Sequence, residues 1–151
     1  MNKKLVVYFS HKGENYSKGK ILNLEKGNTE VAAEIISNIV DADIFEIVAD
    51  KKYPFKYDEC IEIAKRELRE NSRPKLKEDI DIKEYDTIFV AYPNWWGTMP
   101  MPVWTFLEEK DFTNKKVLPF CTHEGSGLGK SERDIKKLTG GAEVLKGLAI
   151  N

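Results

Sequence analysis

The sequence contains little cysteine and histidine, with two of each among its 151 residues. Cys60 and Cys121 are too few for a disulfide framework. Neither a CxxC motif nor a Cys/His ligand spacing is present, which argues against a structural zinc site. An excess of charge of one sign is also missing, because 24 Lys and Arg face 25 Asp and Glu for a net charge of -1. This balance gives no support to binding of nucleic acid or of a membrane surface.

Long hydrophobic runs are missing too. The chain starts with Met1–Lys4, and only six residues follow before a polar loop. That stretch is too short for the core of a signal peptide or for a membrane span. Together with the low cysteine content, this pattern predicts a reduced, cytoplasmic protein.

The composition that remains is that of an ordinary globular protein, with 41% hydrophobic and 32% charged residues. At about 150 residues per domain, residues 1–151 are expected to form one domain. A chain of this length buries roughly two thirds of its unfolded surface, so it needs no metal or disulfide for stability. The sequence shows no internal repeat, linker or low-complexity segment.

Short, continuous hydrophobic runs rich in β-forming residues recur along the chain. Each is expected to be a strand buried on both faces, as in a parallel sheet. The four runs are Leu5–Phe9, Ile44–Val48, Thr87–Tyr92 and Val117–Cys121. A weaker fifth strand is expected within Ala142–Ile150, where Lys146 and Gly147 interrupt the run.

Helical periodicity fills the intervals between these strands. The predicted helices are Thr29–Val40, Tyr57–Asn71, Pro102–Lys110 and Ser131–Leu138. One face of the first helix carries branched side chains, namely Val31, Ile35, Ile36 and Ile39, and Thr29 lies in the N-cap region. The order strand–helix, repeated four times and followed by a strand, predicts an α/β fold with a five-stranded, doubly wound parallel sheet.

Two features do not fit a minimal version of this fold. Residues 11–27 separate the first strand from its helix and are long for a βα loop. The chain also stops at Asn151, just after the fifth strand, so the final helix that would cover this strand is missing. Either the chain is shortened or another surface covers the strand. We therefore expect an apolar patch at Val144, Leu148 or Ile150, and self-association through it.

Ligands of an open parallel sheet bind outside the carboxyl ends of the strands, so the residues after each strand are the candidates for a site. Ser10 follows the first strand, and Gly27-Asn28-Thr29 leads into the first helix. Small hydroxyls, amides and glycine at a helix N-terminus suit a bound phosphate, because backbone N–H groups and the helix dipole favour an anion.

Two further loops follow the third and fourth strands. Tyr92–Pro100 contains the adjacent Trp95 and Trp96, which suit stacking on a flat ring, and Thr122–Gly129 is rich in glycine. Phosphate at the first loop and a planar ring at these two describe a mononucleotide, for which a flavin fits best. We expect the ring of His123 to lie against the flavin, although it could be a solvated loop residue. Cys121 could be a thiolate nucleophile, but a packed thiol at the end of a buried strand is favoured.

These segments resemble the flavodoxin family. Ser10 with Gly27-Asn28-Thr29 is similar to the phosphate loop of flavodoxins, here split by residues 11–27, and the segments Tyr92–Pro100 and Cys121–Gly127 are similar to their flavin-ring loops. The resemblance implies a flavodoxin-like sheet of strand order 2-1-3-4-5, bound FMN and one-electron transfer. It implies FMN contacts by Ser10, His11, Asn28, Thr29, Tyr92, Pro93, Asn94, Trp95, Trp96, Gly97, Thr122, His123, Glu124 and Gly125.

The implied function is that of a low-potential electron carrier between redox proteins, a reductase and an acceptor. An FMN-dependent NAD(P)H oxidoreductase of the quinone reductase type is the alternative. It needs room for nicotinamide over the flavin, and two tryptophans in the ring loop argue against that room. A flavodoxin-like binding module without catalysis is a third possibility. No catalytic residue and no metal ligand are expected.

Overall fold

The computed structural model describes residues 3–11, 13–17, 20–24, 26–123, 125 and 127–150. Its main sheet has the order β4-β1-β5-β6, and both β7 and β8 pair with β6 beyond that. The strands are β1 (Lys3–Tyr8), β4 (Asp43–Glu46), β5 (Tyr85–Pro93), β6 (Lys116–Thr122), β7 (Glu143–Val144) and β8 (Leu148–Ile150), and all pairings are parallel. Taking β7 and β8 as one broken strand gives the order 2-1-3-4-5, so the predicted α/β fold is confirmed.

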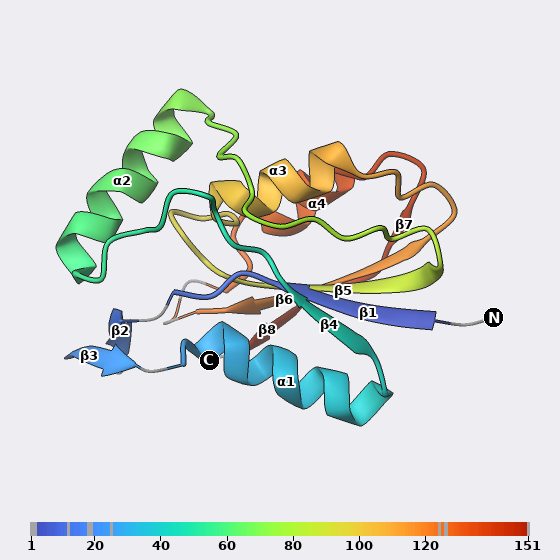
Figure 1. Cartoon of the computed structure of the whole chain (residues 1–151), viewed down its shortest axis with the longest axis horizontal. Helices are drawn as coiled ribbons and strands as arrows, with labels where there is room; N and C mark the ends of the chain where they lie inside the picture. Colours follow the sequence, from blue (N-terminus) through green and yellow to red (C-terminus); the bar gives the residue numbers. More distant parts are fainter. Residues whose placement is uncertain are drawn as a thin grey trace.

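The four predicted helices are present almost within their predicted limits. They are α1 (Asn28–Val40), α2 (Tyr57–Glu70), α3 (Met101–Glu109) and α4 (Ser131–Leu138). Figure 1 shows α1 on one face of the sheet and α3 with α4 on the other, while α2 stands at one end of the sheet. Helix α1 begins one residue earlier than predicted, with Gly27 rather than Thr29 at the N-cap. Asn71, the last residue of the predicted second helix, is the left-handed C-cap of α2.

Each face of the sheet has its own hydrophobic core. Beneath α3 and α4, side chains such as Val90, Phe106 and Ile135 are fully buried. Beneath α1, a smaller cluster contains Tyr8, Ala33 and other buried residues of β1 and β5. Continuous burial along β1 and β5 explains why their sequences show no alternation of polar and apolar residues.

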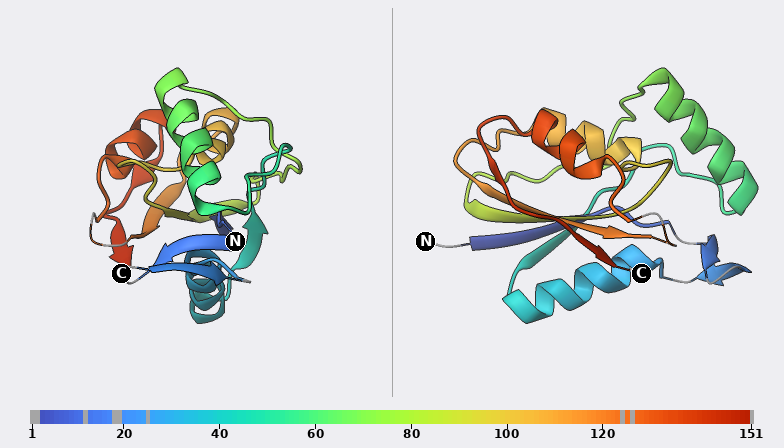
Figure 2. Two further views of the ribbon diagram at one scale, coloured as in Figure 1. Left: turned by 90° about the vertical axis from the view of Figure 1, so that its left-hand side faces the viewer. Right: turned by 180° about the vertical axis from the view of Figure 1, so that it is seen from behind.

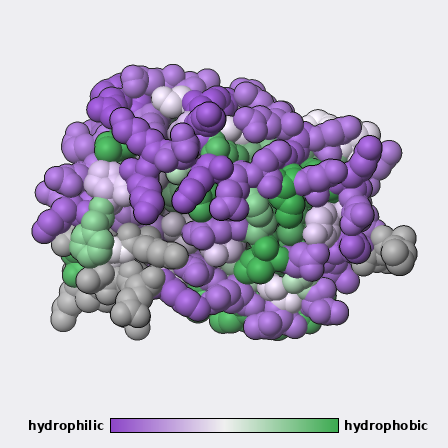
Figure 3. Space-filling model, in the orientation of Figure 1, coloured by the Kyte–Doolittle hydropathy of each residue, from purple (hydrophilic) through white to green (hydrophobic). Residues whose placement is uncertain are grey.

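The apolar face of α1 is turned differently from what its sequence suggests. Val31, Ile35 and Ile39 are 43%, 53% and 77% exposed, while Ala32 and Ala33 lie in the buried face. The rings of the sheet beneath α1, Tyr8 among them, are large, and small alanines let the helix pack closely over them. Figure 3 shows hydrophobic residues reaching the surface along α1, at the lower edge of the view.

The weak fifth strand is divided into the two short strands β7 and β8. The break falls at Leu145–Gly147, where the sequence is interrupted by Lys146 and Gly147. Leu148 is 54% exposed, as expected for the uncovered part of this strand. Val144 differs from that expectation, because it is only partly exposed and packs against the core beneath α4.

The long segment between β1 and α1 contains a β-hairpin that the sequence did not reveal. Strand β2 (Gly13–Ser17) pairs antiparallel with β3 (Lys20–Leu24). The hairpin lies beyond the carboxyl end of the sheet, beside the start of α2 (Figures 1 and 2). Gly13 anchors its base, because a Cβ there would lie 2.8 Å from the ring of Phe55.

Two classes of feature are missing from the residues that the structure describes. None of their helices has the length and hydrophobicity that crossing a membrane requires. No group of three or more His, Cys, Asp or Glu side chains among them is arranged to hold a metal ion.

Candidate functional site

The carboxyl ends of three neighbouring strands bring the candidate loops together. The N–H of Phe9, after β1, donates to the carbonyl of Ala91 in β5, and the N–H of Asn94 donates to the carbonyl of Thr122 in β6. Parallel strands place their carboxyl ends at the same edge, so the loops that follow β1, β5 and β6 are neighbours. The left panel of Figure 2 looks onto this edge, with the hairpin and α2 in front of it.

Three of the predicted phosphate-site residues, Ser10, Asn28 and Thr29, lie around the start of α1, together with Thr122 from a predicted ring loop. The hydroxyl oxygen of Ser10 accepts a hydrogen bond from the N–H of Glu30 at 3.2 Å. The hydroxyls of Thr29 and Thr122 are 2.7 Å apart and buried. Asn28 is the exposed first residue of the helix. The first turn of α1 therefore lies beside small hydroxyl groups from two strand ends, Ser10 after β1 and Thr122 at the end of β6.

The local geometry leaves room and free donors for an anion. Gly27 packs so closely that a Cβ there would lie 2.1 Å from the Ser10 hydroxyl oxygen and 2.8 Å from the carbonyl oxygen of His11. Gly27 supplies no side-chain cap, and within the described part of the chain the N–H groups of Asn28 and Thr29 have no hydrogen-bond acceptor. Unsatisfied N–H groups at a helix start are the usual donors to a bound phosphate.

The loop after β5 contains a tight two-residue turn. Trp95 and Thr98 form an antiparallel bridge in which the N–H of Trp95 donates to the carbonyl of Thr98 at 2.9 Å. The two residues between them, Trp96 and Gly97, both have positive φ, 58° and 88°. This is the pattern of a type I′ turn, which normally carries Asn or Gly. A bulky residue in the left-handed region costs about 1–2 kcal/mol, so Trp96 is held in an unfavourable backbone conformation.

Asn94 holds this turn and joins it to the loop after β6. Its side-chain oxygen accepts from the N–H of Gly97 at 2.8 Å, and its side-chain nitrogen donates to the carbonyl of Gly127 at 2.8 Å. The carbonyl of Gly97 in turn accepts from the N–H of Lys130 at 2.6 Å. Gly129 approaches so closely that a Cβ there would lie 2.4 Å from that carbonyl oxygen. The two ring loops are therefore joined by hydrogen bonds and form one unit.

Buried polar contacts fix this unit to α4. The hydroxyl of Thr98 donates to the carboxylate of Asp134 at 2.6 Å, and the hydroxyl of Tyr92 donates to Ser131 at 2.8 Å. Tyr92 is fully buried, and burial raises the pKa of its phenol above the usual range. These contacts hold the start of α4 against the loop of β5.

The two adjacent tryptophans have different environments. Trp95 packs edge-on against Phe9, Tyr53 and His11, with centroid distances of 5.1, 5.3 and 6.3 Å. Trp96 is 52% exposed. The ammonium of Lys65, from α2, lies 5.6 Å from the centroid of its ring. Trp95 is thus a packing residue of an aromatic cluster, and Trp96 offers the free indole of the site.

The two histidines are also held differently. His11 is nearly buried, and its Nε2 lies 2.8 Å from the carbonyl oxygen of Pro54, in the segment that precedes α2. His123 is half-buried, and its Nδ1 accepts from the N–H of Gly125 at 2.9 Å. Gly125 itself is exposed, with φ of 112°. Pro93 ends β5 at the same edge. Glu124, the remaining predicted contact, lies outside the described residues.

Burial raises the pKa of three titratable groups near the site, Cys121, Tyr53 and Glu67. Cys121 is fully buried, and burial raises the pKa of its thiol to about 12, which agrees with the packed-thiol alternative rather than with a nucleophile. The hydroxyl of Tyr53 donates to the carboxylate of Glu67 on α2. Burial, and then this hydrogen bond, raise the pKa of Tyr53 far above its ordinary value. Burial also raises the pKa of Glu67, against the lowering effect of the hydrogen bond.

Lys65, Tyr53 and Phe55 are residues at this edge that the sequence analysis did not identify. Lys65 belongs to a helix segment of mixed charge, which is typical of a solvated face. Its contact with Trp96 joins elements 31 residues apart, so no local pattern in the sequence signals it. Tyr53 follows no predicted strand directly, and only its aromatic character could have suggested a place in a cluster.

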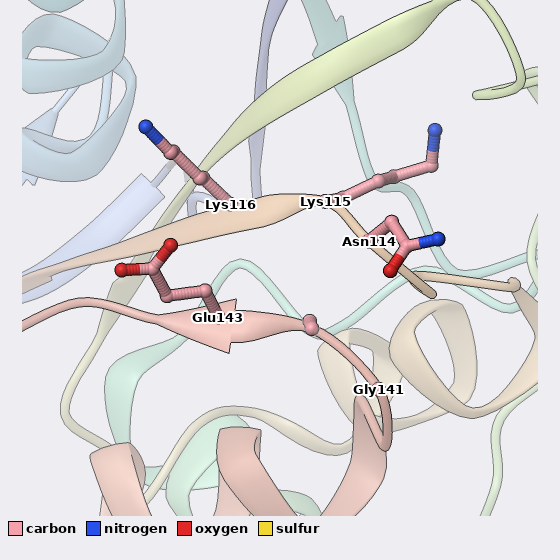
Figure 4. A pocket seen from close by; sticks show the side chains of 6 residues that line it. Asn114, Lys115, Lys116, Gly141 and Glu143 are labelled. Carbon is pink, nitrogen blue, oxygen red and sulfur yellow. The ribbon is translucent and has the colours of Figure 1, made fainter.

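A hollow of about 350 Å³ lies at the opposite end of β6 and is lined by Asn114, Lys115, Lys116, Gly141, Ala142 and Glu143. Figure 4 shows the ammonium groups of Lys115 and Lys116 pointing in diverging directions. The Lys115 ammonium donates to the carbonyl of Tyr85, outside the hollow. No pair of cations converges on one point there, so we assign this hollow no function.

The fold and the edge of the sheet together define a class of protein. A parallel sheet of order 2-1-3-4-5, with an open helix start and two joined loops at its switch point, is the arrangement of a flavodoxin-like protein. The sequence profile described as Flavodoxin matches residues 3–151, which is nearly the whole chain. The chain belongs to this family. No curated protein sequence matches it.

Solved structures with the same fold support this assignment. A protein of Bacteroides eggerthii DSM 20697 and one of Bacteroides uniformis ATCC 8492, for both of which a flavoprotein function has been suggested, have TM-scores of 0.81 and 0.80. They are 28% and 30% identical to this chain, cover 99% and 98% of it, and are themselves covered to 88% and 89%. A flavoprotein of Lactobacillus acidophilus NCFM in complex with FMN is 24% identical, with a TM-score of 0.75 and coverage of 99% and 93%.

Proposed function

We propose that this chain binds FMN at the carboxyl edge of its sheet and carries single electrons at low potential between redox proteins. The proposal rests on one observation, which is that three parts of the site lie at one edge of the sheet. These parts are the open N-terminus of α1, the two loops joined by hydrogen bonds, and the exposed indole of Trp96. Membership of the flavodoxin family supports it, as does the FMN complex of the Lactobacillus acidophilus protein.

The start of α1 is suited to hold the phosphate of FMN. The N–H groups of Asn28 and Thr29 donate to the anion, and the Ser10 and Thr122 hydroxyls complete the cradle. Gly27 keeps the cradle narrow because no Cβ fits there. The helix dipole favours negative charge at this end, so the cradle needs no lysine or arginine.

The two ring loops are suited to hold the flat ring of FMN, which supplies electron-transfer chemistry when it is bound. Trp96 offers its indole for stacking, and His123 and Gly125 lie in the neighbouring loop. An electron-rich indole disfavours negative charge on a ring stacked against it, which favours a low potential. The peptide between Trp96 and Gly97 is suited to change its hydrogen bonding, because glycine tolerates either orientation of the backbone.

Two buried protic groups beside the edge, the Cys121 thiol and the Tyr92 phenol, are not suited to act as acids or bases at neutral pH. The Cys121 thiol and the Tyr92 phenol both stay protonated at neutral pH because burial raises the pKa of each. The proposal accordingly gives these two groups no part in proton transfer. The partners we propose are a reductase that delivers electrons and an acceptor that receives them.

The test is the visible absorption spectrum of the purified protein, followed by reductive titration. We expect a yellow protein, or a colourless one that becomes yellow on addition of FMN, and two separate one-electron steps on reduction. A colourless protein that does not take up FMN would overturn the proposal. Bleaching of the bound flavin by NADPH alone would replace electron carriage with NAD(P)H oxidoreductase activity.

A further inference from the structure

Lys65 is the charged residue of α2 that contacts the candidate ring site. Its ammonium lies 5.6 Å from the centroid of the Trp96 ring, within the range of a cation–π interaction. Lys65 is exposed and forms no ion pair with a carboxylate of the described residues. Its charge is therefore available to the indole.

The position of Lys65 is set by rigid contacts of its helix. On the inner side of α2, Cys60 and Ala64 are buried. Glu67 accepts a hydrogen bond from Tyr53, whose ring packs against Trp95 at 5.3 Å. The helix that carries Lys65 is thus tied to the aromatic cluster from which the Trp96 turn starts. Figures 1 and 2 show α2 standing beside the loop that follows β5.

Trp96 needs such support more than an ordinary loop residue does. Its backbone is in the left-handed region, and half of its side chain is exposed. Apart from Lys65, none of the described residues makes an aromatic or cation–π contact with its indole. A cation on one face restricts the orientations of the ring and leaves the other face for a ligand.

We propose that Lys65 is a positioning residue of the ring site, which holds the indole of Trp96 in the orientation that stacks on the flavin. This inference rests on the proposed binding of FMN. A cation–π contact at an exposed site is worth about 0.5–1 kcal/mol, which corresponds to roughly a 2- to 5-fold change in Kd. The effect passes through Trp96 and disappears when the indole is absent.

The test is a double-mutant cycle on the full chain, with FMN as the titrant and quenching of flavin fluorescence as the readout. We expect Lys65→Met to raise the Kd for FMN by about 2- to 5-fold and Lys65→Arg to restore it, since a guanidinium also interacts with an indole. Arg66→Met is the matched control, because it removes the same charge one residue along α2. It should leave the Kd unchanged.

The second arm of the cycle uses the background Trp96→Leu, in which Lys65→Met should have no further effect on the Kd. An unchanged Kd in Lys65→Met, an equal loss in Arg66→Met, or a loss that persists in the Trp96→Leu background would each overturn the proposal. Failure of the unmodified protein to bind FMN would instead overturn the proposed function, so the two failures are distinguishable. Acrylamide quenching of tryptophan fluorescence in the apoprotein gives an independent readout, which should increase in Lys65→Met.

Discussion

Truncation of the two neighbouring tryptophans should separate stability from flavin binding. Trp95 makes three edge-on aromatic contacts, each worth about 0.5–1.5 kcal/mol, and loss of a packed tryptophan costs about 3–5 kcal/mol in all. Because Trp95 is partly exposed, we expect Trp95→Ala to lower the free energy of unfolding by about 3 kcal/mol. Trp96 is 52% exposed and has one cation–π contact, so Trp96→Ala should cost only about 1 kcal/mol.

For the affinity for FMN, we expect the larger loss from truncation of Trp96 rather than of Trp95. Stacking of a flat ring on an aromatic side chain is worth about 1–3 kcal/mol, so Trp96→Ala should raise the Kd for FMN by roughly 5- to 150-fold. Trp95→Phe, which keeps an aromatic ring in the cluster, should leave the Kd within about 3-fold. Urea unfolding of the apoproteins, followed by far-ultraviolet circular dichroism, measures the first quantity, and FMN titration measures the second. A wild-type Kd in Trp96→Ala together with a large loss in Trp95→Phe would show that Trp95 is the stacking residue.

Three further changes test other parts of the structure. Gly27→Ala should weaken FMN binding more than tenfold in titration, because its Cβ would displace the hydroxyl of Ser10, and an unchanged Kd would contradict the cradle. Burial raises the pKa of Glu67, so its contribution to stability is present below the unfolded-state pKa and lost as pH rises through the folded one. Glu67→Gln keeps an acceptor for Tyr53 and should flatten the fall in unfolding free energy as the pH rises above the ordinary pKa of a glutamate, about 4.3. Equal slopes in both proteins would refute this. We propose that a second copy of the chain covers the last strand, so Leu148→Lys, at a position 54% exposed, should shift sedimentation toward monomer while changing stability by less than about 0.5 kcal/mol. A wild-type protein that stays monomeric at high concentration would contradict the self-association.

The fold was predictable because its central strands β1 and β5 are buried and its helices are well delimited. The expectation of burial on both faces is wrong for β4, which lies at the sheet edge over Asp43–Glu46 instead of the predicted Ile44–Val48 and is partly exposed. Continuous apolar runs such as Thr87–Tyr92 identified the strands of a parallel sheet without knowledge of their neighbours. Helix limits agreed within about a residue, although the sequence analysis placed Thr29 rather than Gly27 at the N-cap of α1 and counted the C-cap Asn71 as part of the second helix. The hairpin within residues 11–27 was not predicted, because its strands are short and rich in charged and polar residues.

The place of the site was predictable, but the roles of its members were not. Strand order puts the residues after β1, β5 and β6 at one edge, and Ser10, Thr29 and Thr122 do meet there. The sequence could not distinguish Trp95 from Trp96, because the distinction depends on Phe9 and Tyr53 from distant segments. It also could not show that Val31, Ile35 and Ile39 of the predicted face are exposed, whereas Ile36 of the same face packs against the cluster beneath α1.

The hairpin has a consequence for how this chain can be altered. The chain enters and leaves the hairpin at adjacent positions, because Gly13 pairs with Leu24. Ser10, before the hairpin, and Glu30, after it, are still joined by a hydrogen bond in the cradle at the start of α1. Residues added between Ser17 and Lys20 would lengthen the excursion without altering the spacing of the anion donors. The chain therefore carries a position where a peptide tag or a fluorescent label could report on the neighbouring ring loops while leaving the cradle intact.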